Sequence, residues 1–266
     1  MSNANVEITE TDALTIASVP CLGDNFGYLV RDNASGAVGA VDAPDAAPLK
    51  AALTELGWKL SHVILTHHHN DHIAGVDELR ALGGVTVVGS SADAERLPAL
   101  DLAVAPGKTW KFGQQDVQVI DTPGHTVGHV VHYLPGAGVL FSGDTLFAMG
   151  CGRLFEGTAA QMWGALERLA ALPEETVVCF GHEYTAANGK FALTVDGANE
   201  ALKRRVAKIQ ETLAGGGRTT PTTIGLEKLT NPFLRAATPE VANEVGLPGA
   251  DAAIVFAEVR RRKDAG

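Results

Sequence analysis

Short apolar runs recur along the chain as far as about residue 180, and many of them end at Asp, Gly or Pro. Runs of this length and boundary predict short β-strands. Apolar residues at helical spacing occupy two of the intervening segments, and the first of these ends near Gly57. We expect strands at residues 13–18, 26–31, 38–41, 62–66, 85–88, 116–120, 130–134, 138–142 and 176–180. We expect helices at residues 46–57 and 73–82.

The clearest helix signal begins at Thr158. Thr158 and Gln161 form a capping-box pattern, in which two side chains satisfy backbone N–H groups at the start of a helix. Apolar residues follow at helical spacing on one face, which we expect to pack into the core. These residues are Met162, Ala165, Leu166 and Leu169.

The chain changes character after about residue 185. An apolar stripe from Leu202 to Leu213 predicts a helix that stops at Gly215, the first of three glycines. Residues 218–239 are rich in Thr and Pro and predict a long ordered loop. A last helix is expected at residues 250–262.

The elements predict two domains. Residues 1–185 form an α/β domain of many short strands, and residues 186–266 form a helical C-terminal domain. The chain is 45% hydrophobic and 20% charged, which is ordinary for a globular protein that buries a full core.

A soluble cytoplasmic protein is expected. The start MSNANVEITE is polar and acidic, and no run of eighteen apolar residues occurs. Cys21, Cys151 and Cys179 are far apart and form no CxxC pair, so they indicate neither a disulfide framework nor a zinc ribbon. No exposed apolar stripe is obvious, and we therefore expect a monomer.

The net charge of −10 is unevenly distributed. Residues 1–185 carry 9 Lys and Arg against 22 Asp and Glu, whereas residues 186–266 carry 12 against 9. The acidic balance disfavours nucleic acid as a partner. The mildly basic C-terminal part is suited to a small anion, although an ordinary solvated helix surface explains it equally well.

The segment Thr66-His67-His68-His69-Asn70-Asp71-His72 carries the strongest chemical signal. It follows the predicted strand at 62–66, and strand ends deliver loop side chains to one edge of a sheet. His67 and His69 are two residues apart and can point to the same side in extended backbone. Asp71 and His72 lie where the chain turns into the next helix. Imidazole and carboxylate groups in this arrangement suit Zn, Fe or Mn.

Three later segments place a His or Asp at a glycine turn after a strand. They are Thr122-Pro123-Gly124-His125-Thr126, Gly143-Asp144 and Gly181-His182. One such His alone is more often structural, but four segments of the same kind point to a metal site. We expect His62, His68, His129 and His132 to be structural, with His129 as a possible orienting neighbour. The expected ligands are His67, His69, Asp71, His72, His125, Asp144 and His182.

Seven donors are more than one metal needs, so they indicate two divalent ions with Asp144 as the bridge. Two metals about 4 Å apart can hold a bridging hydroxide, which would act as the nucleophile beside the catalytic carboxylates Asp71 and Asp144. Zinc is the expected metal, and iron and manganese are alternatives. The chain has no G-x-S-x-G motif. These features predict metal-assisted hydrolysis of a carbonyl or phosphoryl ester, and a thiolate leaving group suits it well.

The segments HHHNDH, TPGHT, SGD and FGHEYT together resemble the metallo-β-lactamase superfamily. The resemblance implies an αββα sandwich with the metals at one edge of the sheets, followed here by a helical C-terminal domain. It implies one metal on His67, His69 and His125 and another on Asp71, His72 and His182, with Asp144 bridging.

Further segments narrow the resemblance to the glyoxalase II, or hydroxyacylglutathione hydrolase, family. GDTLF and GCGRLFEG occur within residues 143–157, and HEYT, NPFLR and RRRKD begin at residues 182, 231 and 260. The similarity extends from about residue 15 to residue 264.

This resemblance implies hydrolysis of S-(2-hydroxyacyl)glutathione, such as S-D-lactoylglutathione, to glutathione and D-lactate in methylglyoxal degradation. It implies that Arg153, Tyr184, Arg260 and Lys263 hold glutathione, whose two carboxylates suit cationic partners. Phe155, which is included among the substrate contacts, stands where some relatives have Tyr, so one hydroxyl contact is absent.

Three other functions remain open on the sequence alone. A persulfide dioxygenase with one iron has a similar fold, but the seven donors and the extended C-terminal part argue against it. A hydrolase of lactones or β-lactams would not need the basic C-terminus, and RNA is disfavoured by the charge. A non-catalytic metal-binding protein would be expected to lack some of the ligands.

Overall fold

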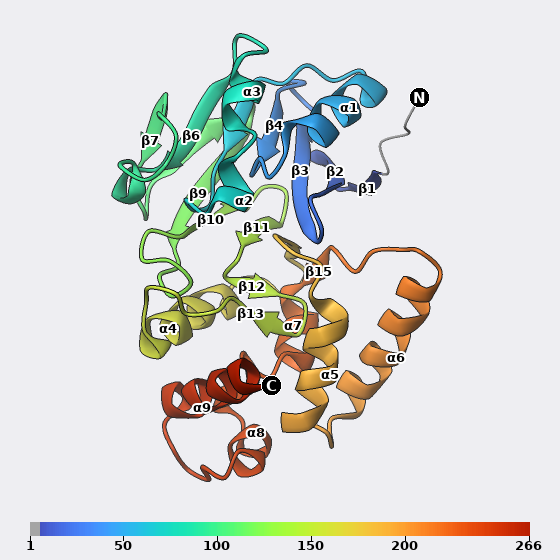
Figure 1. The fold of residues 1–266 in the computed structure, drawn as a ribbon, viewed down its shortest axis with the longest axis vertical. Helices are drawn as coiled ribbons and strands as arrows, with labels where there is room; N and C mark the ends of the chain where they lie inside the picture. Colours follow the sequence, from blue (N-terminus) through green and yellow to red (C-terminus); the bar gives the residue numbers. More distant parts are fainter. Residues whose placement is uncertain (1–5) are drawn as a thin grey trace. The chain divides into compact units, whose positions relative to one another are not determined.

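The structure of the chain is a computed structural model that describes residues 6–266 (Figure 1). The first five residues of the expected polar start lie outside the described residues. The chain forms two compact units: unit 1 is the chain up to Asp121 with Gly128–Gly143, and unit 2 is Thr122–Val127 with Asp144–Gly266. This division does not test the expected domain boundary after residue 185, which stays a prediction. No helix within residues 6–266 combines the length and apolar character needed to cross a membrane.

A seven-stranded mixed sheet forms one layer of unit 1. Its strands lie in sequence order, antiparallel from the first to the fourth and parallel from the fourth to the seventh. The five strands expected before residue 90 are confirmed with small shifts in their bounds, whereas the first and last strands of the sheet were not predicted. The strands are β1 (Glu7–Glu10), β2 (Leu14–Cys21), β3 (Asn25–Asp32), β4 (Val38–Val41), β5 (His62–Ile64), β6 (Thr86–Ser90) and β7 (Leu102–Val104).

A second layer of unit 1 consists of antiparallel strands that pack against this sheet. The Tyr28 and Phe141 rings lie 5.8 Å apart between centroids, and the His62 and Phe112 rings lie 5.3 Å apart. Close packing of the layers depends on Gly39, since a Cβ there would lie 3.2 Å from the Phe112 ring. The strands are β8 (Thr109–Phe112), β9 (Gln115–Asp121), β10 (Val130–Leu134) and β11 (Val139–Gly143), of which β8 was not predicted.

Helices α1 (Ala46–Leu56) and α3 (Val76–Arg80) pack on the first sheet of unit 1 (Figure 1). Asp45 caps the start of α1, and Gly57 ends it in the left-handed conformation, with φ 65°. The helix expected at residues 73–82 is confirmed only over α3, because Ile73 ends a separate short helix, α2 (Asn70–Ile73). Between them, the Gly75 backbone N–H donates to the Ala43 carbonyl oxygen at 2.8 Å, and a Cβ at Gly75 would lie 2.6 Å from the Ala46 backbone nitrogen, so this position requires glycine.

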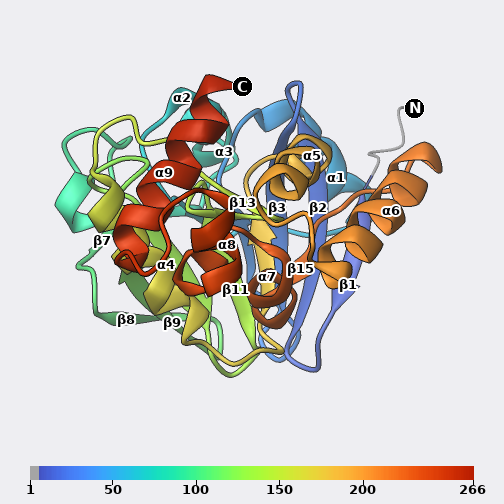
Figure 2. The same cartoon turned by 90° about the horizontal axis from the view of Figure 1, so that it is seen from below.

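Unit 2 is mainly helical, and its first helix is the expected capped one. The reciprocal hydrogen bonds between Thr158 and Gln161 start α4 (Ala159–Ala170), whose apolar face is buried as predicted. In Figure 2, α9 lies beside α4, where Trp163 and Phe256 are in ring contact. The other helices are α5 (Thr185–Val195), α6 (Glu200–Ala214), α7 (Ile224–Thr230), α8 (Pro239–Glu244) and α9 (Ala252–Ala265). The strands are β12 (Leu146–Phe147), β13 (Gly150–Cys151), β14 (Val177–Phe180) and β15 (Thr222–Thr223).

The long loop expected at residues 218–239 is wrong. This segment contains β15, α7 and the short helix η2 (Arg235–Ala237). Its order comes from a buried ion pair, since Arg205 Nη2 lies 2.5 Å from Glu227 Oε1 and both side chains are nearly inaccessible. Thr223 also accepts a hydrogen bond from the backbone of Leu226 and so caps α7. The Thr-rich composition therefore marks caps and buried hydroxyl partners rather than a loop.

Three buried side chains of unit 2 hold the tight turn between β12 and β13. Asn231 Nδ2 donates to the carbonyl oxygens of residues 147 and 150. Asn188 Nδ2 donates to the Ala148 carbonyl, and Glu227 Oε2 accepts from the Met149 backbone N–H at 2.8 Å. Met149 has φ 53°, a left-handed conformation that is unusual for a residue with a side chain. The turn that follows Asp144 is therefore fixed by side chains from α5 and the α7 region.

Candidate metal centre

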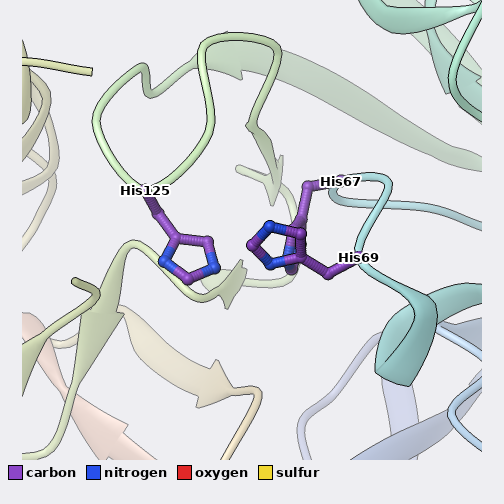
Figure 3. Close-up of side chains that lie close together, drawn as sticks. All are labelled: His67, His69 and His125. Atoms are coloured by element: carbon purple, nitrogen blue, oxygen red, sulfur yellow. The ribbon is translucent and has the colours of Figure 1, made fainter. Parts of the chain in front are cut away.

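The loop after β5 gathers four of the predicted donors in unit 1. His67 and His69 lie on this loop, and α2 begins at Asn70, which places Asp71 and His72 on its first turn. The His67 ring lies 4.7 Å from the His69 ring and 4.2 Å from the His72 ring, measured between centroids. His72 Nε2 lies 3.8 Å from Asp71 Oδ2. Figure 3 shows His67 and His69 on this loop and His125 on the loop after β9.

Asp42 orients two of these imidazoles and was missed by the sequence reasoning. His72 Nδ1 lies 2.8 Å from Asp42 Oδ2, which also accepts the Thr66 hydroxyl at 2.8 Å. The His67 Nδ1 in turn lies 3.0 Å from Thr66 Oγ1. Asp42, His67 and His72 form a group that could itself hold a metal ion, but Asp42 is already engaged as an acceptor. The available signal was its position, since Asp42 directly follows the strand β4.

Asn25 positions Asp71. Its Nδ2 group donates to the Asp71 backbone oxygen at 3.0 Å and lies 3.1 Å from Asp71 Oδ2. Asn25 is buried at the start of β3, whereas Asp71 is partly exposed. One rigid amide therefore fixes both the backbone and the carboxylate of an expected ligand.

Unit 2 gathers the three remaining donors around one carboxylate. Asp144 Oδ2 lies 3.4 Å from His125 Nε2 and 3.2 Å from His182 Nε2. All three side chains are buried. His125 Nδ1 lies 2.9 Å from the Arg153 carbonyl oxygen, to which it donates. The Asp144 carboxylate thus lies between two imidazole nitrogens that are both expected metal ligands.

Glycines make room for this cluster in unit 2. A Cβ at Gly152 would lie 2.0 Å from the Asp144 carbonyl oxygen and 3.0 Å from His125 Nδ1. Gly124, before His125, has φ 156°, and a Cβ there would lie 2.7 Å from the Met162 side chain. Both positions therefore require glycine for steric reasons.

The other four histidines have structural contacts, as expected. His68 Nδ1 lies 3.0 Å from Asp93 Oδ2, which anchors the loop between two expected ligands. His132 Nε2 donates to the Leu65 carbonyl oxygen, and burial lowers the pKa of His132. His62 packs against aromatic rings, and burial lowers its pKa also. His129 stacks on the His67 ring at 4.8 Å between centroids.

Two aromatic residues among the expected substrate contacts lie against the donors of unit 2. The Phe155 side chain is 63% exposed, and its ring lies 5.2 Å from the His125 ring. The Tyr184 ring stacks on the His182 ring at 4.8 Å with an angle of 4° between the planes. Arg153 is exposed and lies on the same segment as Phe155. These positions are suited to contact with a ligand at the metal donors.

The two basic residues of α9 differ from each other. Arg260 is buried, lies 5.1 Å above the Phe233 ring and donates to the Cys151 carbonyl oxygen and to Asp264. Lys263 is partly exposed, and burial, together with the positive charges of Arg260 and Arg153, lowers its pKa. Arg260 is therefore built into the packing of unit 2, whereas Lys263 is the more accessible cation.

The chemistry of the donors fits divalent metal ions. His67, His72 and His125 each donate through Nδ1 to an oxygen atom, which leaves Nε2 of each ring as a neutral ligand nitrogen. This outer hydrogen bonding is typical of metal-binding histidines. Combined with the carboxylates of Asp71 and Asp144, the donors suit zinc, iron or manganese.

Comparison with known proteins identifies the family. Residues 37–182 match the metallo-β-lactamase superfamily, and residues 183–266 match the C-terminus of hydroxyacylglutathione hydrolase. A relative from Ruegeria pomeroyi, a hydroxyacylglutathione hydrolase, is 53% identical over 94% of this chain and 98% of its own length.

Solved structures confirm the expected fold class. The B3 metallo-β-lactamase BLEG-1 covers 82% of this chain and 99% of its own, with a TM-score of 0.64 and 23% identity. TTHA1623, solved in a di-iron-bound form, covers 79% of this chain and 95% of its own, with a TM-score of 0.59 and 27% identity. With the sandwich of unit 1, the helical C-terminal region and the two family matches, the chain belongs to the hydroxyacylglutathione hydrolase (glyoxalase II) family of the metallo-β-lactamase superfamily.

Proposed function

We propose that this chain hydrolyses S-(2-hydroxyacyl)glutathione thioesters. The physiological substrate would be S-D-lactoylglutathione, and the products would be glutathione and D-lactate. The observation that carries the proposal is family membership over nearly the whole chain, including the C-terminal residues 183–266 that distinguish this family within the superfamily. The reaction would serve methylglyoxal degradation. A cytoplasmic location and a monomeric state remain predictions.

We further propose that the seven expected donors hold two divalent ions. Support comes from the side-chain groups that could hold a metal ion, among them His67 with His69 and His125, and Asp71 with His72 and His182. Asp144, placed between His125 and His182, would be shared by the two ions. TTHA1623 in its di-iron form supports the count of two. Zinc is the proposed metal, and iron or manganese would fit the same donors.

The residues of the chain have separate tasks in this reaction. Bound divalent ions would supply a hydroxide at neutral pH and stabilise the charge that develops on the thioester oxygen. Asp42 and Asn25 keep His72 and Asp71 in the orientation that ligation needs. Phe155 and Tyr184 would line the substrate path beside the donors. Lys263 is an accessible cation and would attract a carboxylate of glutathione. Arg153, whose positive charge acts on Lys263, would add to this attraction.

The decisive experiment measures the loss of thioester absorbance when the purified chain meets S-D-lactoylglutathione. Rapid loss that a chelator abolishes, and that Zn, Fe or Mn restores, would establish the activity and its metal dependence together. Metal analysis of the active protein gives the number of ions per chain. If no loss occurs after each metal is added in turn, the glutathione thioester is the wrong substrate, and glutathione persulfide with oxygen uptake is tested next.

A further inference from the structure

A cavity of about 510 Å³ in unit 2 lies outside the metal donors and the expected glutathione contacts. One wall is a face of α6, on which residues 201, 204, 205, 208, 209 and 212 recur at helical spacing. The rest of the lining comes from residues 218, 219, 221 and 222 and from Leu226 of α7. Its volume lies in the range of pockets that hold small molecules.

The polar lining of this cavity is cationic. Arg204, Lys208 and Arg218 line it together with the hydroxyls of Thr212 and Thr219, and no carboxylate lines it. Arg204 and Lys208 are four residues apart on α6, so their like charges lie on neighbouring turns and repel each other. A dianionic group between them would replace this repulsion with attraction.

Most of the carboxylates near this lining are engaged with other groups. Glu227 is buried against Arg205, whose guanidinium also donates to Thr222 and Thr230. Glu183 accepts two hydrogen bonds from Thr219, and Glu200 pairs with Lys203 outside the cavity. Glu211 lies 3.5 Å from Lys208, but both side chains are more than 70% exposed, so the pair is weak.

The remaining lining is apolar. Ala201, Ile209, Pro221 and Leu226 offer hydrocarbon surface to whatever occupies the cavity. A ligand that contacts both the cationic and the apolar lining has a compact apolar or aromatic body and a dianionic head group. A phosphate monoester meets this description better than a carboxylate, since one head group then faces several cations, and arginine presents a planar fork to its oxygens.

We propose that the cavity between α6 and residues 218–222 binds a small organic phosphate. The test titrates the metal-loaded, full-length protein by calorimetry with AMP, phenyl phosphate, inorganic phosphate and adenosine. Both organic phosphates are expected to bind one per chain and at least about tenfold more tightly than inorganic phosphate or adenosine, because only they fill both parts of the cavity.

A double variant tests the site itself. Arg204→Gln with Lys208→Gln is expected to weaken AMP binding by about tenfold or more, while the rate of thioester hydrolysis stays unchanged. The matched control, Lys203→Gln with Lys228→Gln, also removes two positive charges, but from exposed ion pairs outside the cavity. It should leave AMP binding intact. Far-UV circular dichroism of both variants checks that the fold is retained.

Three results would overturn the proposal. Equal binding of inorganic phosphate and AMP would reveal attraction to charge alone, and equal binding of adenosine and AMP would reveal an apolar pocket without phosphate recognition. Equal loss of AMP affinity in the control variant would show a general effect of net charge. Thioester hydrolysis is measured separately, so each of these failures is distinguishable from failure of the proposed enzymatic function.

Discussion

Asn25 holds Asp71 by two contacts, one to the backbone oxygen and one to the carboxylate. The two residues are 46 positions apart in sequence, and the contacts join the start of β3 to the first turn of α2. A buried amide thus determines where an expected metal ligand points, although it touches no metal itself.

Replacing Asn25 is expected to weaken metal binding. In Asn25→Ala, the Asp71 carboxylate gains rotational freedom, so affinity for the metal should fall by about 10- to 100-fold. Competition with a chromophoric chelator measures this change directly. Asn33→Ala is the matched control, since Asn33 is an exposed residue beyond the end of the same strand. An unchanged affinity in Asn25→Ala would show that Asp71 needs no such support.

Asp42 is expected to matter through His72. In Asp42→Asn, the shape is retained, but the charge that favours the Nδ1–H form of His72 is lost. We expect metal affinity to fall by about 10- to 100-fold in the chelator competition. Asp45→Asn serves as the control, because Asn replaces Asp well at the start of a helix. Equal effects of the two substitutions would contradict a special role of Asp42.

Asp144→Asn is expected to abolish turnover almost completely. The amide cannot serve as a charged ligand shared by two ions, so the loss should exceed the roughly 100-fold effect of an outer hydrogen-bonding partner. Thioester hydrolysis and metal content are measured on the same preparation, and one ion per chain instead of two is expected. Activity like that of the unchanged protein would rule out a bridging role for Asp144.

We expect Arg260 to contribute to the stability of the fold and Lys263 to contribute to substrate binding. Arg260→Met removes buried hydrogen bonds, so the free energy of unfolding should fall by about 1–3 kcal/mol. Lys263→Met should leave stability nearly unchanged and raise KM for the glutathione thioester. Urea unfolding and steady-state kinetics on both variants separate the two effects. If Lys263→Met changes stability alone, Lys263 is not a glutathione contact.

Asp32 predicts a specific acid dependence of stability. Burial opposes ionisation, but hydrogen bonds from Ser35, Gln114 and Gln115 outweigh burial and lower the pKa of Asp32 from 3.8 to about 2. The resulting stability is present above about pH 4 and is lost as the pH falls toward 2. Asp32→Ala should therefore lose about 2 kcal/mol at pH 7 and much less near pH 2. Urea unfolding across this range checks the slope, with the exposed Asp12→Ala as a control.

The strands and the expected ligands follow from local patterns in the sequence. Apolar runs such as residues 62–64 and 177–180 form strands in the structure. A continuous apolar run can be buried on both faces of a sheet, so its identity as a strand does not depend on one particular neighbour. The family and the enzyme class predicted from the motifs are confirmed by the comparisons. The individual site residues remain predictions.

Other features depend on contacts that no local pattern reveals. Asp42 reaches a histidine 30 residues away, so its role becomes visible only in the folded chain. Gly75 lies between α2 and α3, where its N–H donates to the Ala43 carbonyl oxygen, a contact between distant residues. Helix α5 has neither a side-chain cap nor a clear apolar stripe, and its order comes from packing on α6. In each case tertiary packing outweighs local preference.

The turn between β12 and β13 has a consequence for metal binding. Asn231, Asn188 and Glu227 hold its backbone through contacts that involve no metal. The segment after Asp144 is thus preorganised, and an arriving ion need not offset the conformational entropy of ordering it. Metal binding at Asp144 should therefore not require this segment to fold, and it should show little of the heat-capacity change that accompanies coupled folding.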